Sequence, residues 1–295
     1  MAYDGLYQAS RFTLHASRST YPAVCPMNET AVGVFDSGIG GLSVLRHLQR
    51  LLPHENFIYL ADQAHVPYGP RSHAEIRRLS EAATRRLLAQ PIKLLVVACN
   101  TASAAALSYL RQTFPDLPIV GMEPAVKPAA RQTQTGKVGV LATAGTFESQ
   151  RYASLMARFA QGVTLYENPC RGLVELIEAG ETEGEETAVL LQQILTPMLE
   201  AGVDTLVLGC THYPFVTPLL NRLLAAASQP VTIIDPAPAV ARQAQRVLAQ
   251  HGLLTTATNP GTTRYLTTGP APGLAQAITR LLGDQSSKVT EWRGG

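Results

Sequence analysis

Two cysteines stand where a short apolar run gives way to small polar residues. Cys99 follows the run Leu94–Ala98, and Cys210 comes shortly after the run Thr205–Leu208. Where a strand ends at the start of a helix, the helix N-terminus lowers the pKa of a thiol from its free value of about 8.5. Such a thiol can take and give a proton near neutral pH, so both cysteines are candidates for acid–base catalysis.

The same part of the sequence allows a metal-site interpretation. Zinc is bound by Cys, His and Asp side chains, and Cys99, Cys210, His212 and Asp36 supply these types. The spacing argues against zinc, because structural sites usually draw on closely paired cysteines and a single Cys-x-His is a weak signal. We expect no metal and keep a zinc-dependent enzyme as a remote alternative.

A glycine-rich segment, Asp36-Ser-Gly-Ile-Gly-Gly41, joins an apolar run to a helical pattern. It resembles a dinucleotide-binding loop, with Asp62 near the place of a ribose-binding acid, so an NAD-dependent oxidoreductase is a second remote alternative. Ser43 replaces the third glycine of that motif, however, and the Asp36 carboxylate would repel a pyrophosphate. We instead expect the loop to hold Asp36 and Ser37 at the floor of a site, while backbone amides bind a carboxylate.

Apolar runs rich in β-branched residues alternate with segments of helical period from residue 31 onward. This alternation predicts an α/β fold with mainly parallel sheets. Among the helices we expect Leu42–Leu52 and Ala74–Ala89, and the latter has an apolar stripe beside arginines. The expected strands are Val32–Phe35, Phe57–Leu60, Leu94–Ala98, Ile119–Gly121, Val138–Leu141, Thr205–Leu208 and Val231–Ile234.

A faint internal repeat suggests two similar halves. The segments that begin at Val32, Val96 and Glu123 resemble, in the same order, those at Val138, Val207 and Asp235. We therefore expect two pseudo-symmetric α/β domains, with the active site in the cleft between them, because ligands of open α/β sheets bind beyond the carboxyl ends of the strands. The acidic-Pro-Ala turns would be the crossing points, which gives a first domain of residues 31–123 plus 236–285 and a second of 124–235.

Composition limits the classes of partner. The net charge of +2 over 295 residues leaves no basic stripe for a nucleic acid, and no apolar run is long enough for a membrane span. Four widely spaced cysteines indicate free thiols in a reducing cytoplasm. Cys25 and Cys170 lack the strand-end setting, and we interpret both as inert. The sequence leaves the oligomeric state open, with a homodimer as one option.

Residues 1–30 are polar and lack the apolar core and cleavage site of a signal peptide. Two interpretations remain open for this extension. The first is that it has no regulatory role, being either a disordered tail or extra sequence upstream of a true start at Met27. The second is that it is a regulatory segment.

Four motifs taken together resemble the signatures of glutamate racemases, and they occur in the family's order between about residues 31 and 250. The His after Cys-Thr and the Asp-Ser-Gly opening are similar to the glutamate branch of the aspartate/glutamate racemase superfamily. A racemase of aspartate or a related small diacid is therefore the main alternative. The motifs are Asp36-Ser37, Pro67-Tyr-Gly69, Ala98-Cys-Asn-Thr-Ala-Ser103 and Leu208-Gly-Cys-Thr-His-Tyr-Pro214.

The resemblance implies cofactor-independent racemisation of L-glutamate to D-glutamate in a bacterial cytoplasm, which supplies D-glutamate for peptidoglycan. It implies that Cys99 removes the proton from D-glutamate and Cys210 from L-glutamate, and that Asp36, His212 and Glu178 assist them. Pattern alone would make Glu178 a solvated helix residue. The positions that match substrate-binding residues are Asp36, Ser37, Tyr68, Gly69, Asn100, Thr101, Thr211 and His212. Some family members with N-terminal extensions are activated by UDP-N-acetylmuramoyl-L-alanine, so residues 1–30 suggest that activator here.

The chemistry explains why these residue types are needed. The Cα–H of an amino acid is a very weak acid, and no lysine lies in the motifs to hold a pyridoxal group that would delocalise the charge. Preorganised hydroxyl and amide donors must therefore stabilise the charge on the substrate carboxylate. Inversion also requires one group on each face of Cα, one ionised and the other protonated.

Overall fold

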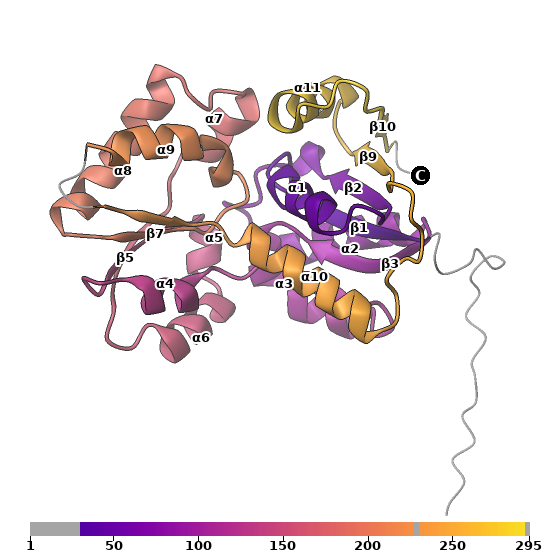
Figure 1. Ribbon diagram of the computed structural model, residues 1–295, viewed down its shortest axis with the longest axis horizontal. Helices are drawn as coiled ribbons and strands as arrows, with labels where there is room; N and C mark the ends of the chain where they lie inside the picture. Colours follow the sequence, from indigo (N-terminus) through magenta and orange to yellow (C-terminus); the bar gives the residue numbers. More distant parts are fainter. Residues whose placement is uncertain (1–29, 227–229, 293–295) are drawn as a thin grey trace, which may run out of the picture.

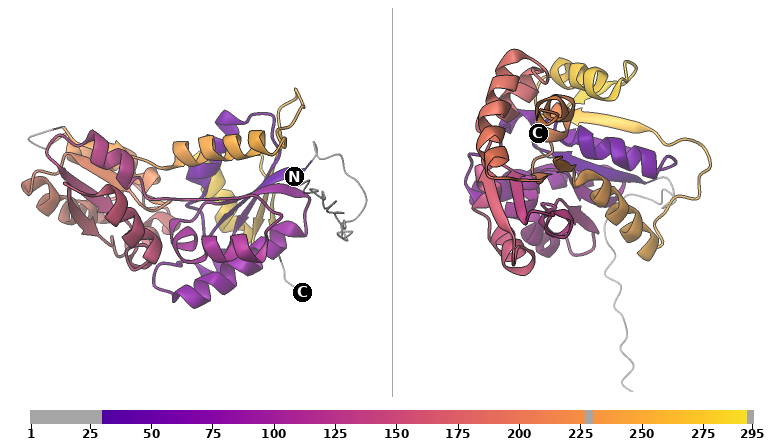
Figure 2. Two further views of the ribbon diagram at one scale, coloured as in Figure 1. Left: turned by 90° about the horizontal axis from the view of Figure 1, so that it is seen from below. Right: turned by 60° about the vertical axis from the view of Figure 1, so that its left-hand side comes forward.

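The structure is a computed structural model that describes residues 30–226 and 230–292. Two parallel β-sheets lie in two lobes side by side, and further views confirm their separation (Figures 1 and 2). Every strand pairing in these residues is parallel. The predicted α/β fold with mainly parallel sheets is therefore confirmed.

Lobe 1 is built on a six-stranded sheet in the order β10-β9-β2-β1-β3-β4. Its central strand β1 is buried along its whole length, as expected for a strand covered on both faces. The sheet takes its last two strands from the C-terminal part of the chain, so the polypeptide leaves this lobe and returns. The strands are β1 (Ala31–Asp36), β2 (Phe57–Ala61), β3 (Ile92–Val97), β4 (Ile119–Gly121), β9 (Thr263–Thr267) and β10 (Val289–Glu291).

Lobe 2 is built on a four-stranded sheet in the order β6-β5-β7-β8. Its central strands β5 and β7 are largely or wholly buried, whereas β6 at the edge is half exposed. The strands are β5 (Lys137–Leu141), β6 (Thr164–Asn168), β7 (Thr205–Leu208) and β8 (Thr232–Ile234). The carboxyl ends of β3 in lobe 1 and β7 in lobe 2 lead directly to the two cysteines of interest.

Helices cover both sheets and bring the lobes together. In lobe 1, α1 packs against α10, and α2 packs against α3. Across the boundary, α3 contacts α5 and α6 of lobe 2. Lobe 1 carries α1 (Leu42–Leu51), η2 (Gln63–His65), α2 (His73–Leu88), α3 (Asn100–Thr113), α10 (Ala237–Gln250) and α11 (Ala271–Leu282). Lobe 2 carries α4 (Val126–Gln132), α5 (Ala144–Phe147), α6 (Gln150–Phe159), α7 (Leu173–Ala179), α8 (Glu185–Glu200), η3 (Tyr213–Val216) and α9 (Thr217–Leu224).

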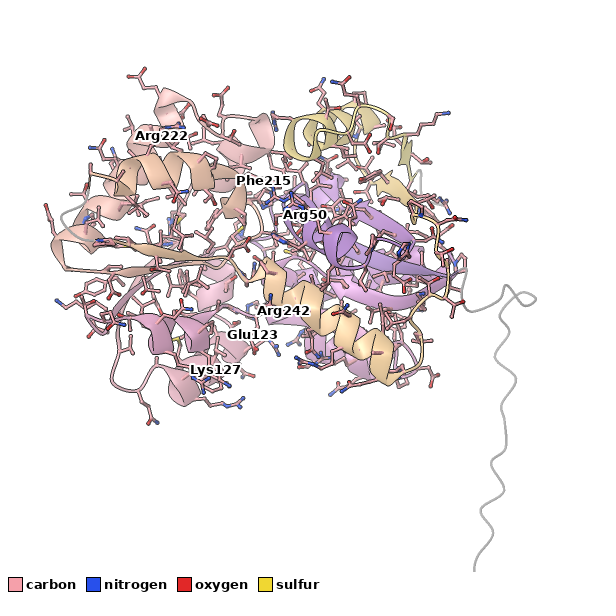
Figure 3. All side chains as sticks on the ribbon, viewed as in Figure 1. Arg50, Glu123, Lys127, Phe215, Arg222 and Arg242 are labelled. Carbon is pink, nitrogen blue, oxygen red and sulfur yellow. The ribbon has the colours of Figure 1, made fainter. Side chains whose placement is uncertain are left out.

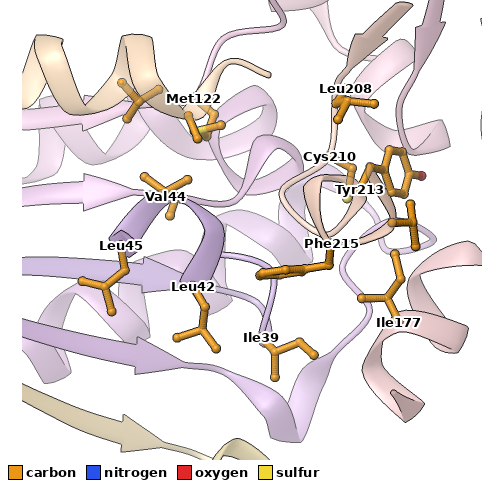
Figure 4. Close-up of a cluster of buried hydrophobic side chains, with 14 of the residues drawn as sticks. Ile39, Leu42, Val44, Leu45, Met122, Ile177, Leu208, Cys210, Tyr213 and Phe215 are labelled. Carbon is orange, nitrogen blue, oxygen red and sulfur yellow. The ribbon is translucent and has the colours of Figure 1, made fainter. Parts of the chain in front are cut away.

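One apolar cluster runs from lobe 1 into lobe 2. Ile39 of the glycine-rich loop and Leu42 at the start of α1 share it with Ile177 of α7 and with Phe215 of η3. Figure 4 shows Phe215 lying between these groups. Apolar surface buried in this way stabilises the contact by about 25 cal/mol per Å². The lobes are therefore held together next to the glycine-rich loop of residues 36–41.

All seven strands expected from the sequence are present, with bounds that differ by two residues at most. The two named helices are also close to expectation, at Leu42–Leu51 and His73–Leu88. Strands β6, β9 and β10 were not among those expected. Strand β10 also lies beyond residue 285, where the first domain was expected to end. Residues 1–29, including Cys25 and Met27, lie outside the described residues. No helix in the described ranges is both long and apolar enough to cross a bilayer.

A buried ion pair joins the amino ends of β3 and β2 in lobe 1. Lys93 Nζ lies 2.6 Å from Glu55 Oε2, and both side chains are 2% exposed. The other carboxylate oxygen of Glu55 accepts a hydrogen bond from the backbone N–H of Thr255. The pair therefore ties the returning C-terminal segment to the sheet.

Replacing Lys93 with Met should lower the free energy of unfolding by about 3–5 kcal/mol, because it leaves the Glu55 carboxylate buried without its cation. Urea denaturation would measure the change. The exposed pair Arg222–Glu183 on the outside of lobe 2 provides the control (Figure 3). Arg222→Met should cost less than about 1 kcal/mol, and equal losses in the two variants would contradict a special role for the buried pair.

Candidate active site

A cavity of about 350 Å³ lies between the lobes, which is within the usual size range of small-molecule sites. Lobe 1 contributes Cys99 and lobe 2 contributes Cys210. The predicted arrangement, with one strand-end thiol from each half on a shared cleft, is what the structure contains. Its lining also includes Ser37, Pro67, Tyr68, Gly69, Asn100, Thr101, Thr143, Cys170, Arg171, Glu175, Thr211, His212 and Tyr213.

Cys99 is the N-cap residue of α3, and its Sγ accepts a hydrogen bond from the backbone N–H of Ala102 at 3.4 Å. The Ser37 hydroxyl lies 3.5 Å from the same sulfur. Burial, followed by the negative charge of Asp36, raises the pKa of the Cys99 thiol to about 12, although both hydrogen bonds oppose the rise. The helix N-terminus was expected to lower this pKa, and burial outweighs it. Cys99 is therefore protonated at neutral pH.

Cys210 has a different environment, because a buried histidine stands beside it. His212 Nδ1 lies 3.7 Å from Cys210 Sγ, and His212 Nε2 lies 2.6 Å from Glu178 Oε1. Burial would lower the pKa of His212, but its hydrogen bonds to Cys210 and Glu178 outweigh burial and raise it well above the ordinary 6.5. Burial likewise opposes the ionised form of Glu178, yet His212 and the Ile39 amide hold the pKa of Glu178 below its ordinary value. The Cys210 thiol thus faces an imidazolium held by a carboxylate.

Asp36 ends β1 and is completely buried. Its Oδ1 accepts a hydrogen bond from the backbone N–H of Gly38, and its Oδ2 accepts one from the Thr211 hydroxyl of lobe 2 at 3.1 Å. Burial raises the pKa of Asp36, while the charge of His212 acts against that rise. Asp36 and Glu178 are not part of the cavity lining, so both carboxylates act from behind Thr211 and His212.

The glycine-rich loop is used to approach lobe 2 closely. A Cβ on Gly40 would lie 2.4 Å from His212 Nδ1, and a Cβ on Gly38 would lie 2.1 Å from Glu178 Oε1. The Ile39 N–H donates to that same Glu178 oxygen at 2.9 Å. The Ile39 amide therefore binds a carboxylate of the protein itself, and binding of a ligand carboxylate by the loop stays a prediction. Because this amide is bonded to Glu178, the loop does not resemble one that binds a pyrophosphate.

Asp62, considered as a ribose-binding acid, has another use in the structure. Its buried carboxylate accepts hydrogen bonds from the Tyr68 hydroxyl at 2.6 Å and the Thr268 hydroxyl at 2.7 Å. Tyr68 in turn lines the cavity. Asp62 thus fixes a wall of the site, and burial together with the charge of Asp62 raises the pKa of Tyr68.

Asn100 has the clearest unmet hydrogen-bonding capacity in the cavity. The residue is 4% exposed, and neither its Oδ1 nor its Nδ2 has a hydrogen-bond partner within the described residues. Buried amides without partners are costly, so a group that enters the cavity and bonds to Asn100 gains affinity. Of the eight positions expected to bind substrate, seven line the cavity and Asp36 lies behind it.

Several lining residues had no role assigned from the sequence, and Thr143 and Cys170 are two of them. The Thr143 hydroxyl lies 2.8 Å from that of Thr101 across the lobe boundary, and its position just after β5 was the available signal. Cys170, interpreted as inert, is buried, lines the cavity and has a positive φ of 44°. Within residues 30–226 and 230–292, no group of three or more His, Cys, Asp or Glu residues is arranged to hold a metal ion.

Each lobe places one thiol, at the end of a parallel strand, on the shared cavity. This arrangement defines the class of protein as an α/β enzyme that takes one acid–base group from each lobe. The family model described as Asp/Glu/Hydantoin racemase matches residues 32–244. The chain is 53% identical to a glutamate racemase of Ectopseudomonas mendocina over 88% of this chain and 97% of that protein. It is 50% identical to the glutamate racemase of Pseudomonas aeruginosa over 88% and 97%.

Solved structures agree with the sequence matches. A glutamate racemase isoform from Bacillus anthracis is 33% identical with a TM-score of 0.80, covering 89% of this chain and 98% of that chain. Escherichia coli glutamate racemase, in complex with L-glutamate and activator UDP-MurNAc-Ala, is 34% identical with a TM-score of 0.75, covering 89% and 97%. The chain therefore belongs to the Asp/Glu/hydantoin racemase family and, within it, to the glutamate racemases.

Glu178→Gln should lower the pKa of His212, because the variant removes the carboxylate charge that favours the imidazolium. An NMR titration of the imidazole ring would measure the shift. Glu183→Gln, at the exposed pair with Arg222, is the matched control and should leave the titration unchanged. An unaltered His212 titration in Glu178→Gln would contradict the pairing.

The same pair predicts how stability depends on pH. The raised pKa of His212 contributes stability in full below its unfolded value of about 6.5 and loses it as pH rises through the folded value. The lowered pKa of Glu178 contributes in full above about 4.5 and loses it as pH falls. The difference in unfolding free energy between wild type and Glu178→Gln should therefore be largest between about pH 4.5 and 6.5, as urea denaturation across pH would test.

Proposed function

We propose that this protein interconverts L-glutamate and D-glutamate by passing the Cα proton between Cys99 and Cys210, without a cofactor. The single observation that carries the proposal is the pair of thiols that reach one cavity from two lobes. Inversion at Cα needs one acid–base group on each face, and two lobes closing on a substrate supply that arrangement. The sequence identity of 53% and 50% to two glutamate racemases supports glutamate as the substrate.

On this proposal the two thiols start in opposite protonation states. Cys99, with its raised pKa, holds a proton to give, and Cys210 beside the imidazolium of His212 is the group that takes one. L-Glutamate then loses its Cα proton to Cys210 and receives one from Cys99. The reverse transfer starts from D-glutamate. Glu178 keeps His212 cationic. Asp36, outside the cavity lining, accepts a hydrogen bond from Thr211 and interacts electrostatically with His212.

Charge that develops on the substrate carboxylate must be stabilised by fixed donors, because no ring delocalises it. The unpartnered amide of Asn100 and the hydroxyls of Ser37, Thr101 and Thr211 line the cavity and have the required chemistry. We assign Tyr68, Gly69 and these residues to substrate binding. Thr143, which contacts Thr101, extends the same polar wall.

The family resemblance extends the proposal to physiology. We propose that the enzyme supplies D-glutamate for peptidoglycan in the cytoplasm, and that UDP-MurNAc-Ala activates it, since the E. coli relative forms a complex with that activator. The activator proposal is tested by racemisation rates with and without the precursor, for the full chain and for a chain that begins at Met27. Equal rates for the full chain in both conditions would exclude activation. A homodimer stays a prediction for light scattering to test.

Cys99→Ser and Cys210→Ser should each reduce racemisation of glutamate by at least about 10³-fold, because an alcohol is a far weaker acid than a thiol and cannot share the proton near neutral pH. EDTA-treated protein is incubated with L-glutamate in D₂O, and optical rotation and loss of the Cα proton signal are followed together. Cys170→Ser, at a thiol that lines the cavity but has no part in the proposal, is the matched control and should retain activity.

Three outcomes would contradict parts of the proposal. Racemisation by either variant at the wild-type rate would remove that cysteine from its role. A wild type that racemises aspartate faster than glutamate would reassign the substrate. Loss of activity on EDTA treatment, with recovery on adding zinc, would replace the metal-free mechanism.

A further inference from the structure

Ser43 is a buried hydroxyl outside the cavity that nothing in the proposed chemistry uses. It lies in the first turn of α1, is fully buried, and replaces the third glycine of the dinucleotide-like motif. Its Oγ lies 2.8 Å from the carbonyl oxygen of Gly40 in lobe 1 and 2.9 Å from the carbonyl oxygen of Thr211 in lobe 2. A single side chain thus contacts the backbone of both lobes.

The Thr211 carbonyl belongs to the peptide bond between Thr211 and His212. This peptide sets where the imidazole of His212 stands relative to Cys210, two residues earlier in the chain. A donor on that carbonyl therefore acts on the base that faces the second thiol. The Gly40 carbonyl shares the single hydroxyl proton of Ser43 with the Thr211 carbonyl. Gly40 is also the residue whose Cα packs against the His212 ring.

Two further contacts from the same loop reach the same place. The Ile39 N–H binds Glu178, and Glu178 binds His212. Lobe 1 thus holds the Cys210 side of the site at three points, namely the Glu178 carboxylate, the His212 ring and the Thr211 carbonyl. The described contacts of Ser43 include none with Cys99.

We infer that Ser43 is a positioning residue for His212, and that lobe 1 thereby sets the reactivity of the thiol in lobe 2. This inference rests on the proposed function for its meaning in catalysis. Its physical content, the placement of His212 beside Cys210, does not depend on the identity of the substrate.

Ser43→Ala should therefore affect the two thiols unequally. Without the hydroxyl, the peptide at Thr211 loses its donor, and the imidazolium no longer stands at a fixed 3.7 Å from Cys210 Sγ. The Cys210 sulfur then lacks a cationic partner at a fixed position. We expect alkylation of Cys210 by iodoacetamide to slow about tenfold, and kcat/KM for glutamate to fall by a similar factor, which corresponds to ~1.4 kcal/mol, while alkylation of Cys99 is unchanged.

Two matched controls separate positioning from a general loss of stability. Ser149→Ala removes another buried serine hydroxyl that bonds to backbone groups in lobe 2, so it should lower the thermal midpoint without changing the Cys210 to Cys99 alkylation ratio. Ser80→Ala removes a buried hydroxyl that has no partner within the described residues, so it should leave the alkylation ratio unchanged and should not lower the thermal midpoint.

Peptide mass spectrometry after timed alkylation of the full-length protein, without substrate, gives the rate at each cysteine. Slower alkylation at Cys210 alone in Ser43→Ala supports the inference. An alkylation ratio equal to that of Ser149→Ala, or equal slowing at both thiols, would overturn it. A wild type that fails to racemise glutamate would refute the proposed function, and the alkylation result would still decide the role of Ser43.

Discussion

The hydrogen bonds that converge on Glu178 Oε1 are the interaction on which the rest of this site depends. That one oxygen accepts from the Ile39 amide of lobe 1 and lies 2.6 Å from His212 Nε2 of lobe 2. A carboxylate that is shared in this way stabilises the imidazolium and fixes the distance between the lobes at the same time. The glycine at position 38 follows from it, because any side chain there would displace the carboxylate.

Most of the strands that the sequence predicted are buried on both faces, and the exception is the edge strand β8, whose residues are exposed or partly exposed. Runs such as Leu94–Ala98 have no polar position, since both faces of the sheet are covered. The missed strands lack such runs for identifiable reasons. The edge strand β6 is half exposed, β10 has a single apolar residue, Val289, and β9 begins with Thr263 and Arg264 before its two buried apolar residues.

The two cysteines could be found from the sequence because each follows a recognisable strand, and the carboxyl end of a parallel strand is where ligands bind. Glu178 could not be found in that way. Its helix has an ordinary apolar face, and the group that gives the carboxylate its purpose is an amide 139 residues away in the sequence. Local periodicity reports which face of a helix is buried and carries no information on what a distant loop presents to the other face. Only the family resemblance singled out this acid.

The two thiols differ because their neighbours carry opposite charges. Cys99 is buried near Asp36, which favours the thiol, whereas Cys210 faces a cationic His212. On the proposed mechanism, the resting site is therefore ready for the enantiomer whose proton points toward Cys210, which is L-glutamate. After each turnover the proton positions are exchanged, and the unequal surroundings favour return to the first state. This bias cannot move the equilibrium, because two enantiomers have equal free energies in water. It must appear as unequal kcat and unequal KM in the two directions, in proportions that leave kcat/KM the same.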